Sequence, residues 1–174
     1  MTDPLPNPAI VVMGVSGAGK STLGQALGDR LGWRFIEGDA LHPAANVAKM
    51  AVGIPLDDAD RRPFLENVAA ALVAHREAGV VASCSALKRG YRDLLRERAG
   101  PIAFVLPMLD RATLAARLAG RAGHFMPPAL LDSQIAALDP PAADENAITV
   151  DGALPIAAQV AAVLAALGRG PLGG

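Results

Sequence analysis

The sequence predicts an α/β protein built on one parallel β-sheet whose two faces are covered by helices. Short apolar runs alternate along the chain with longer segments whose apolar positions repeat at helical spacing. The chain has 174 residues, of which 52% are hydrophobic, so it can bury a single core without disulfides or a structural metal. These two observations place it among single-domain α/β proteins.

Five short segments have the composition of strands. The first, Ala-Ile-Val-Val-Met, is rich in β-branched residues and ends at a glycine. Strands of a covered parallel sheet carry apolar side chains on both faces, so their sequences form continuous apolar runs. The expected strands are residues 9–13, 33–37, 80–86, 102–107 and 147–151.

Seven segments are expected to be helices. Between Lys20 and Leu31 the apolar side chains recur every three or four residues. Asp58 or Asp60 is the expected N-cap of the longest helix, and Asp110 is the expected N-cap of a later one. The expected helices are residues 20–31, 46–53, 58–79, 88–100, 110–123, 127–139 and 154–168.

Charge and cysteine content exclude several classes of protein. Sixteen basic and seventeen acidic residues give a net charge of -1, so no global excess attracts nucleic acid or an anionic membrane. The single cysteine, Cys84, excludes an intrachain disulfide and favours a reducing, cytoplasmic environment. The first eight residues lack a basic segment and the apolar runs are short, so we expect neither a signal peptide nor a membrane span.

A phosphate-binding motif follows the first expected strand. Residues 14–21 match G-x-x-x-x-G-K-[ST], in which backbone N–H groups surround phosphate oxygens. The Lys20 ammonium is expected to reach the β- and γ-phosphates, and the Ser21 hydroxyl is expected to bind Mg²⁺. No Asn-Lys-x-Asp segment for reading guanine is present. The expected nucleotide contacts in this segment are Gly14, Ser16, Gly17, Ala18, Gly19, Lys20, Ser21 and Thr22.

Polar residues follow the other expected strands, at the edge of the sheet where ligands of such folds bind. Glu37 and Asp39 follow the second strand, and a carboxylate there can orient an acceptor hydroxyl and take its proton. Lys88 and Arg92 are four residues apart on one helical face, which fits either an anion site or a solvated basic face. The other polar residues at this edge are Ser85, Arg117, Arg121 and His124.

In five segments the chain resembles the gluconokinases, small P-loop kinases related to shikimate and nucleoside monophosphate kinases. The segments are MGVSGAGKST, GDALHPAANVAKM, GIPLDDADRRPFL, CSALKRGYRDLLR and GHFMPPALLDSQIAALDPP. The resemblance implies ATP-dependent phosphorylation of D-gluconate to 6-phospho-D-gluconate with Mg²⁺, by a homodimer. It also implies a three-layer sandwich with strand order 2-3-1-4-5 and a lid at about 121–128. The chain length predicts one domain over residues 1–174, and the proline- and glycine-rich ends predict flexible tails at about 1–7 and 169–174.

The resemblance also implies roles for individual residues. Asp39 matches the acceptor-side aspartate, and Arg121 matches the lid arginine that closes on the phosphates. The expected catalytic residues are therefore Lys20, Asp39 and Arg121, with Arg117 beside the nucleotide. The expected substrate-binding residues are Asp39, His42, Lys49, Arg62, Ser85, Lys88, Arg92 and His124.

The chain departs from the family pattern near the expected metal. Glu37 stands where the family often has aspartate, and Ser83 and Ser85 stand where many P-loop proteins hold Mg²⁺ with an aspartate. Water-bridged contacts from Glu37 or Asp39 are the expected substitute. Two alternatives remain open. One is a shikimate or nucleotide kinase, and the acid-rich LDDADRR segment argues against a nucleotide acceptor. The other is a non-catalytic nucleotide-binding regulator, against which Lys20, Ser21 and Asp39 argue.

Overall fold

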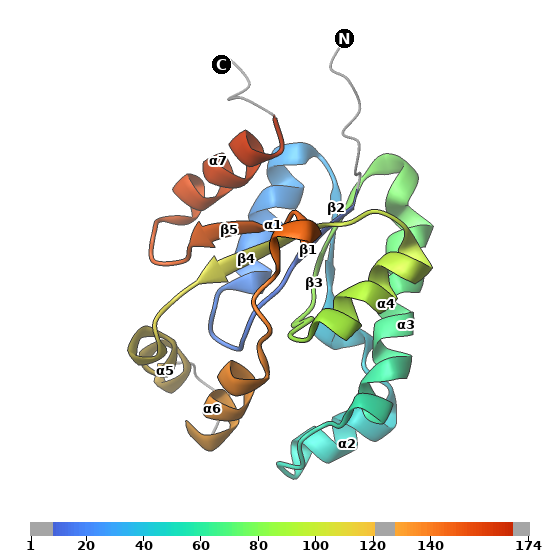
Figure 1. The fold of residues 1–174 in the computed structure, drawn as a ribbon, viewed down its shortest axis with the longest axis vertical. Helices are drawn as coiled ribbons and strands as arrows, with labels where there is room; N and C mark the ends of the chain where they lie inside the picture. The colour runs from blue at the N-terminus through green and yellow to red at the C-terminus, as the bar shows by residue number, and fades with distance from the viewer. Residues whose placement is uncertain (1–8, 121–127, 169–174) are drawn as a thin grey trace.

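The computed structural model describes residues 9–120 and 128–168, in which strands and helices alternate (Figure 1). Three short 3-10 turns supplement them: η1 (Gly38–Leu41), η2 (Arg76–Ala78) and η3 (Ala143–Glu145). The strands are β1 (Ala9–Val12), β2 (Arg34–Glu37), β3 (Val80–Ser83), β4 (Ala103–Met108) and β5 (Ile148–Asp151). The helices are α1 (Lys20–Leu31), α2 (Ala44–Ala51), α3 (Asp58–His75), α4 (Arg89–Ala99), α5 (Arg111–Ala119), α6 (Pro128–Ala137) and α7 (Ile156–Ala166).

The strands form one parallel sheet in the order β2-β3-β1-β4-β5, which confirms the predicted fold class and strand order. Strand β1 lies at the centre and pairs with β3 on one side and β4 on the other. Because all five strands run in the same direction, their carboxyl ends meet at one edge of the sheet. The loops that follow β1, β2 and β3 are therefore neighbours there.

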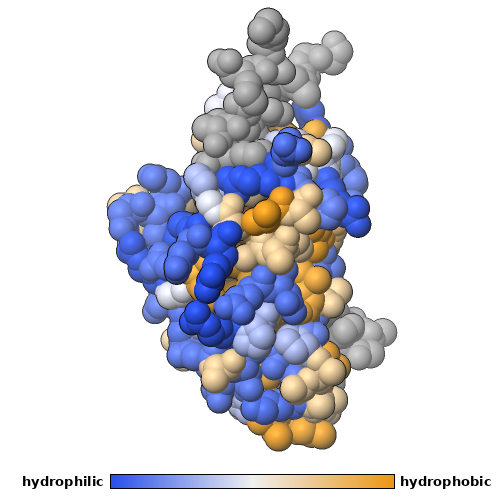
Figure 2. Space-filling view, turned by 90° about the vertical axis from the view of Figure 1, so that its right-hand side faces the viewer, coloured by the Kyte–Doolittle hydropathy of each residue, from blue (hydrophilic) through white to orange (hydrophobic). Residues whose placement is uncertain are grey.

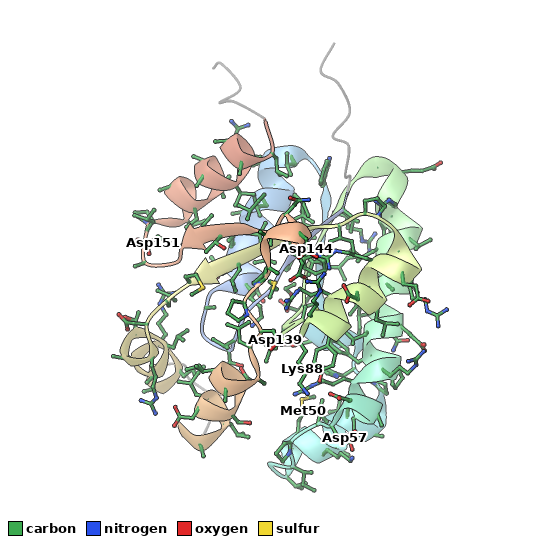
Figure 3. All side chains as sticks on the ribbon, viewed as in Figure 1. Met50, Asp57, Lys88, Asp139, Asp144 and Asp151 are labelled. Atoms are coloured by element: carbon green, nitrogen blue, oxygen red, sulfur yellow. The ribbon has the colours of Figure 1, made fainter. Side chains whose placement is uncertain are left out.

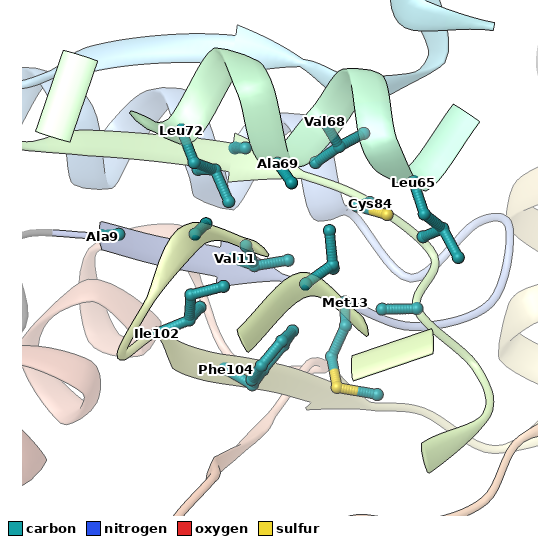
Figure 4. Close-up of a cluster of buried hydrophobic side chains, with 14 of the residues drawn as sticks. Ala9, Val11, Met13, Leu65, Val68, Ala69, Leu72, Cys84, Ile102 and Phe104 are labelled. Carbon is teal, nitrogen blue, oxygen red and sulfur yellow. The ribbon is translucent and has the colours of Figure 1, made fainter. Parts of the chain in front are cut away.

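Strand β1 shows how the sheet is covered on both faces. Its four residues are fully buried. Ala9 and Val11 pack against α3 and α4, whereas Ile10 and Val12 pack against α1 and α7. Figure 4 shows the first of these cores, with side chains of β1 and β4 facing those of α3. Side chains of a strand alternate between faces, so a continuous apolar run is what two covered faces require.

The longest helix begins at residue 58 as predicted, but its N-cap and its last residue differ from the prediction. Its N-cap is Asp57 rather than Asp58 or Asp60: the Asp57 carboxylate accepts from Asp60 N at 2.7 Å, and the Asp60 carboxylate accepts from Asp57 N at 3.1 Å. This reciprocal capping box satisfies two backbone donors that the first helical turn leaves unpaired. At the other end α3 stops at His75, and the turn η2 leads into Gly79.

The amino end of β3 is covered by the only tryptophan of the chain. Trp33 precedes β2, and its ring atoms lie as close as 2.3 Å to the position that a Cβ on Gly79 would occupy. Any side chain at residue 79 would therefore displace the indole. This contact lies at the edge of the sheet opposite the loops that follow the strands.

Two further helices lie against the loop between β1 and α1. Leu114 and Leu118 of α5 and Leu131 of α6 are buried with Val15 and Ala18 of that loop. Figure 1 shows α5 and α6 beyond the carboxyl ends of the strands, opposite α2. Among residues 9–120 and 128–168, no helix has the length and apolar composition needed to cross a bilayer.

Candidate active site

The phosphate loop, residues 14–19, joins β1 to α1 as the motif requires. Gly17 and Gly19 have φ angles of 84° and 87°, in the left-handed region that favours glycine. Gly19 is the N-cap of α1, so the positive end of the helix dipole faces the loop. The predicted strand, glycine loop and helix are thus all present, with Lys20 and Ser21 in the first helical turn.

Two contacts hold the phosphate loop in place. The Lys20 ammonium donates to the Val15 carbonyl at 3.0 Å. The Ser16 backbone N–H donates to the side-chain oxygen of Gln134 on α6 at 2.8 Å. The loop is therefore held partly from within and partly by α6, and no local pattern in the sequence indicates the contact with α6.

Arg117 lies beside the phosphate loop, on the side away from β2. Its Nη2 donates to the Gly152 carbonyl at 3.1 Å, just after β5. Its Nη1 lies 3.7 Å from the position of a Cβ on Gly19. The guanidinium thus stands next to the start of α1, where its charge can act on a bound nucleotide.

A serine at the end of β3 fixes the carboxylate at the end of β2. The buried Ser83 hydroxyl donates to Glu37 Oε1 at 2.6 Å and accepts from Gly38 N at 3.1 Å. Ser83 therefore stands where an aspartate was expected from other P-loop proteins, and it orients Glu37 instead. The carboxylate at this edge of the sheet is therefore Glu37, the last residue of β2, and not an aspartate at the end of β3.

Lys20 and Asp39 follow the two strands that flank β3. Lys20 comes after β1 and the phosphate loop, and the exposed Asp39 lies in the turn η1 after β2. Cys84 follows β3 between them, and burial raises the pKa of its thiol to about 12. As predicted, Cys84 itself is a buried core residue.

His42 is held in one tautomer. Its ring stacks on Phe64, with centroids 3.7 Å apart. One amide hydrogen of Asn46 goes to the Asp60 carbonyl at 2.8 Å, and the other points to His42 Nδ1 at 3.3 Å. Nδ1 is therefore an acceptor, and the ring proton lies on Nε2. Burial lowers the pKa of His42; Asp39 opposes this shift and Arg61 adds to it, so the ring is a neutral donor.

A cationic cluster surrounds Tyr91 at the same edge. The Arg61 guanidinium donates to the Tyr91 hydroxyl at 3.0 Å and lies 5.5 Å from the ring centroid. The Lys88 ammonium lies 5.6 Å from the same centroid and 3.2 Å from Asp58, which also accepts from Tyr91. Figure 3 shows Lys88 at the end of α4 that is nearest to α2.

Arg61, rather than the predicted Arg62, belongs to this cluster. Arg62 is exposed and pairs with Glu66 on the outer side of α3, at 3.5 Å. The sequence held a signal for Arg61, which stands four residues before Leu65 and seven before Val68. It therefore extends the buried stripe of α3 to the edge of the sheet.

The structure places the remaining predicted residues differently. The Lys49 ammonium donates to both oxygens of the Asp60 carboxylate, at 2.9 and 2.8 Å. Arg92, predicted to bind substrate, is fully buried and pairs with Glu145, because α4 begins after Lys88 and turns Arg92 into the core. Ser85 uses its carbonyl to accept from Gly14 N at 3.1 Å. Arg121 and His124 lie outside the described residues.

The chain is similar to several known proteins. A family model described as an AAA domain matches residues 10–141. The chain is 53% identical to the gluconokinase of Gluconobacter oxydans strain 621H over 145 residues, 82% of each chain. It is 47% identical to the thermosensitive gluconokinase of Escherichia coli strain K12, over 80% of this chain and 76% of that one.

Solved structures agree with these relatives. The crystal structure of a gluconokinase from Sinorhizobium meliloti 1021 superposes with a TM-score of 0.85 at 48% identity, covering 94% of this chain and 93% of that one. A shikimate kinase from Bacteroides thetaiotaomicron, with a TM-score of 0.63 and 19% identity over 92% of this chain and 98% of that one, shares the fold alone. With these matches and the phosphate loop on one sheet edge, the chain belongs to the gluconokinase family.

Proposed function

We propose that this protein transfers the γ-phosphoryl group of ATP to D-gluconate, giving 6-phospho-D-gluconate and ADP. The observation that carries the proposal is that Lys20 and Asp39 follow β1 and β2, the strands on either side of β3, in a chain of the gluconokinase family. The likeness to shikimate kinase extends to the fold alone. A non-catalytic regulator would not need an acceptor-side carboxylate opposite the lysine.

The transfer itself needs positioning and charge stabilisation more than covalent help. The acceptor hydroxyl oxygen forms a bond to the γ-phosphorus while the bond from that phosphorus to the β,γ-bridging oxygen breaks. The hydroxyl proton passes to the Asp39 carboxylate, and ADP leaves. Lys20 neutralises negative charge on the phosphates, and the loop N–H groups hold them in place.

Gluconate offers one carboxylate and a row of hydroxyls, and the cluster beside η1 suits both. Arg61 and Lys88 bring positive charge to the same tyrosine, so together they can attract a carboxylate. His42 presents a neutral Nε2–H to a substrate oxygen. These contacts favour a polyhydroxy acid over a nucleotide as the acceptor.

The residues present also suit Mg²⁺. The Ser21 hydroxyl and the Glu37 carboxylate, which Ser83 orients, are oxygen ligands of the kind that Mg²⁺ takes beside substrate phosphates. No group of three or more acidic, histidine or cysteine side chains in the described part of the chain forms a dedicated cage. When bound, Mg²⁺ supplies positive charge at the β- and γ-oxygens. Closure of a lid carrying Arg121, and the homodimer, stay predictions.

The proposal is tested by measuring ADP release with a panel of acceptors. We expect turnover with D-gluconate and little with shikimate or nucleoside monophosphates. Lys20→Ala is the control variant. Its turnover with D-gluconate should fall by at least about 10²-fold, because the substitution removes the positive charge that points to the phosphates. Equal or faster turnover of shikimate or a nucleotide would overturn gluconate as the substrate. A normal rate for Lys20→Ala would overturn the phosphate loop as the catalytic site.

A further inference from the structure

The acceptor loop, residues 85–88, has an unusual backbone. Among the described residues two non-glycine residues have positive φ angles: Ala86, at 42°, and Asn146, at 52°. Asparagine adopts this conformation fairly often, whereas alanine pays a steric cost for it. Such a conformation persists only where surrounding contacts determine it.

Arg92 supplies two of those contacts, and its hydrogen bonds use every N–H that the side chain has. Nε donates to Glu145 Oε1 at 2.7 Å and one Nη2 hydrogen to Glu145 Oε2 at 3.0 Å. The other Nη2 hydrogen goes to the Asp139 carbonyl at 3.0 Å. The two Nη1 hydrogens go to the carbonyls of Ala86 and Leu87, at 2.9 and 3.1 Å. An arginine has five such donors, so all are used.

The segments that Arg92 joins serve both sides of the site. Within the acceptor loop, the Ser85 carbonyl accepts from Gly14 of the phosphate loop at 3.1 Å. The loop ends at Lys88, whose ammonium belongs to the cationic cluster about Tyr91. The Leu87 carbonyl also accepts from Asp139 N at 2.8 Å, which ties the loop to the exit of α6.

Stability alone does not account for this arrangement. The side chains of Arg92 and Glu145 are 0% and 2% exposed, so both charges have lost their hydration. A buried ion pair often stabilises a fold no better than apolar residues of equal volume would. Its fixed bond directions, however, can select one loop conformation among several.

We propose that Arg92 is a positioning residue that holds the acceptor loop in its strained conformation, and so sets where Ser85 meets the phosphate loop and where Lys88 meets the acceptor. The inference rests on the proposed function only for the identity of that acceptor. Lysine at residue 92 would keep the charge but could not reach both carbonyls and both carboxylate oxygens at once.

The test compares Arg92→Lys with Arg96→Lys. Arg96 contacts the same Glu145 carboxylate, at 3.2 Å, but is not bonded to the acceptor loop. We expect Arg92→Lys to raise the KM for gluconate at least about tenfold and lower kcat, since small misplacements of a binding group are costly. Amide hydrogen exchange at residues 86–88 should quicken. Arg96→Lys should lower the melting temperature while leaving the KM within about twofold.

A second variant keeps the test decisive if Arg92→Lys does not fold. Glycine adopts a positive φ without steric cost, so Ala86→Gly should be at least as stable as the wild type. The loop gains conformational freedom, however, so the KM for gluconate should rise. A purely structural role would move stability and activity in the same direction. An unchanged KM in folded Arg92→Lys or Ala86→Gly, or equal effects of Arg96→Lys, would overturn the inference. A wild-type protein inactive on gluconate would instead overturn the proposed function, because loop exchange is measured without substrate.

Discussion

At the scale of single residues, two adjacent arginines have opposite environments. Arg61 contacts Tyr91 within the cationic cluster, and Arg62 pairs with Glu66 on the outside of α3. We expect Arg61→Ala to raise the KM for gluconate by roughly 10- to 100-fold, the effect of losing a charge-assisted hydrogen bond. Arg62→Ala is the matched control and should stay within about twofold, since exposed ion pairs contribute little. Equal KM values for the two variants would contradict the placement of Arg61.

In the proposed mechanism the chemistry depends most on Asp39. Asp39→Asn keeps the shape of the side chain but removes the charge that is proposed to accept the proton. We expect turnover to fall by roughly 10²- to 10⁴-fold, the range for a positioned general base, with little change in ATP affinity. Steady-state rates and binding of an ATP analogue check this. If analogue binding falls together with the rate, Asp39 serves the metal or the fold; if neither changes, Glu37 becomes the candidate base.

The sequence predicts which strand ends form the candidate site, but not the placement of every residue in it. Periodicity predicts that Lys88 and Arg92 share one face of a helix. Lys88, however, is the N-cap of α4 and has an extended backbone, so its side chain does not lie on the helix face that carries Arg92. The partner of Arg92 is Glu145, 53 residues away along the chain, and local patterns carry no information about that pairing. The position after the second strand suggested an acceptor role for Glu37 or Asp39, and the family resemblance singled out Asp39.

At the scale of elements, most predicted segments match the structure within a few residues. The helix from Lys20 to Leu31 agrees at both ends, because glycines flank it on both sides. The predicted strand 80–86 is shorter, ending at Ser83. Beyond that point the chain is still apolar, but Ala86 has a positive φ that a strand does not accept. Apolar composition indicates that residues are buried, not that they form a strand. Cys84 and Ala86 are buried although β3 ends at Ser83, which is why the predicted strand is too long.

The contact between α6 and the phosphate loop predicts an effect on nucleotide binding. The Ser16 N–H that points to Gln134 is one of the loop donors that a phosphate can use. Gln134→Leu frees this donor at similar volume, so we expect ADP affinity to rise by about two- to tenfold, the worth of one net hydrogen bond. Isothermal titration with ADP measures it. Weaker ADP binding would show instead that Gln134 is a nucleotide ligand.

Helix α2 should be the least protected helix on the acceptor side. Its one buried residue is Asn46, whereas Val47 and Met50 are 52% and 45% exposed. Figure 2 shows apolar surface at the lower tip of the molecule, where α2 lies in Figure 1. Few buried apolar contacts mean a low cost of local opening. We expect amide exchange in α2 to be faster than in α3 and to slow with gluconate; equal protection would contradict this.

At the scale of the whole molecule, the ion pair between Arg92 and Glu145 links stability to pH. Hydrogen bonds from Arg92 lower the pKa of Glu145 from 4.5 to about 2, outweighing burial. A carboxylate with a lowered pKa stabilises the fold above its unfolded pKa, and this contribution disappears as the pH falls from 4.5 towards 2. Acid should therefore weaken the protein most steeply in that window.

Urea unfolding at a series of pH values checks this expectation. Glu145→Gln should be less stable than wild type at neutral pH but should lose less stability between pH 4.5 and 2, because its amide does not titrate there. Parallel curves for the two proteins would mean that other carboxylates cause the acid sensitivity.

The order of the strands was the part of the fold that residue patterns could not provide. Apolar runs indicate that strands are buried and parallel, yet any of several orders would bury them equally well. The order came from the family resemblance, and the pairing of β1 with both β3 and β4 confirms it. This pairing brings the phosphate loop and the acceptor loop together.

Trp33 and Tyr91, each the only residue of its kind, lie at opposite edges of the sheet. The indole covers Gly79 before β3 begins, and the phenol lies in the cationic cluster beyond the strand ends. Strand β3 between them spans roughly 13 Å. Indole fluorescence should therefore follow unfolding and stay nearly constant when gluconate binds, while the phenol absorbance should respond to gluconate. The molecule thus carries two intrinsic optical probes, one for its folding and one for its acceptor.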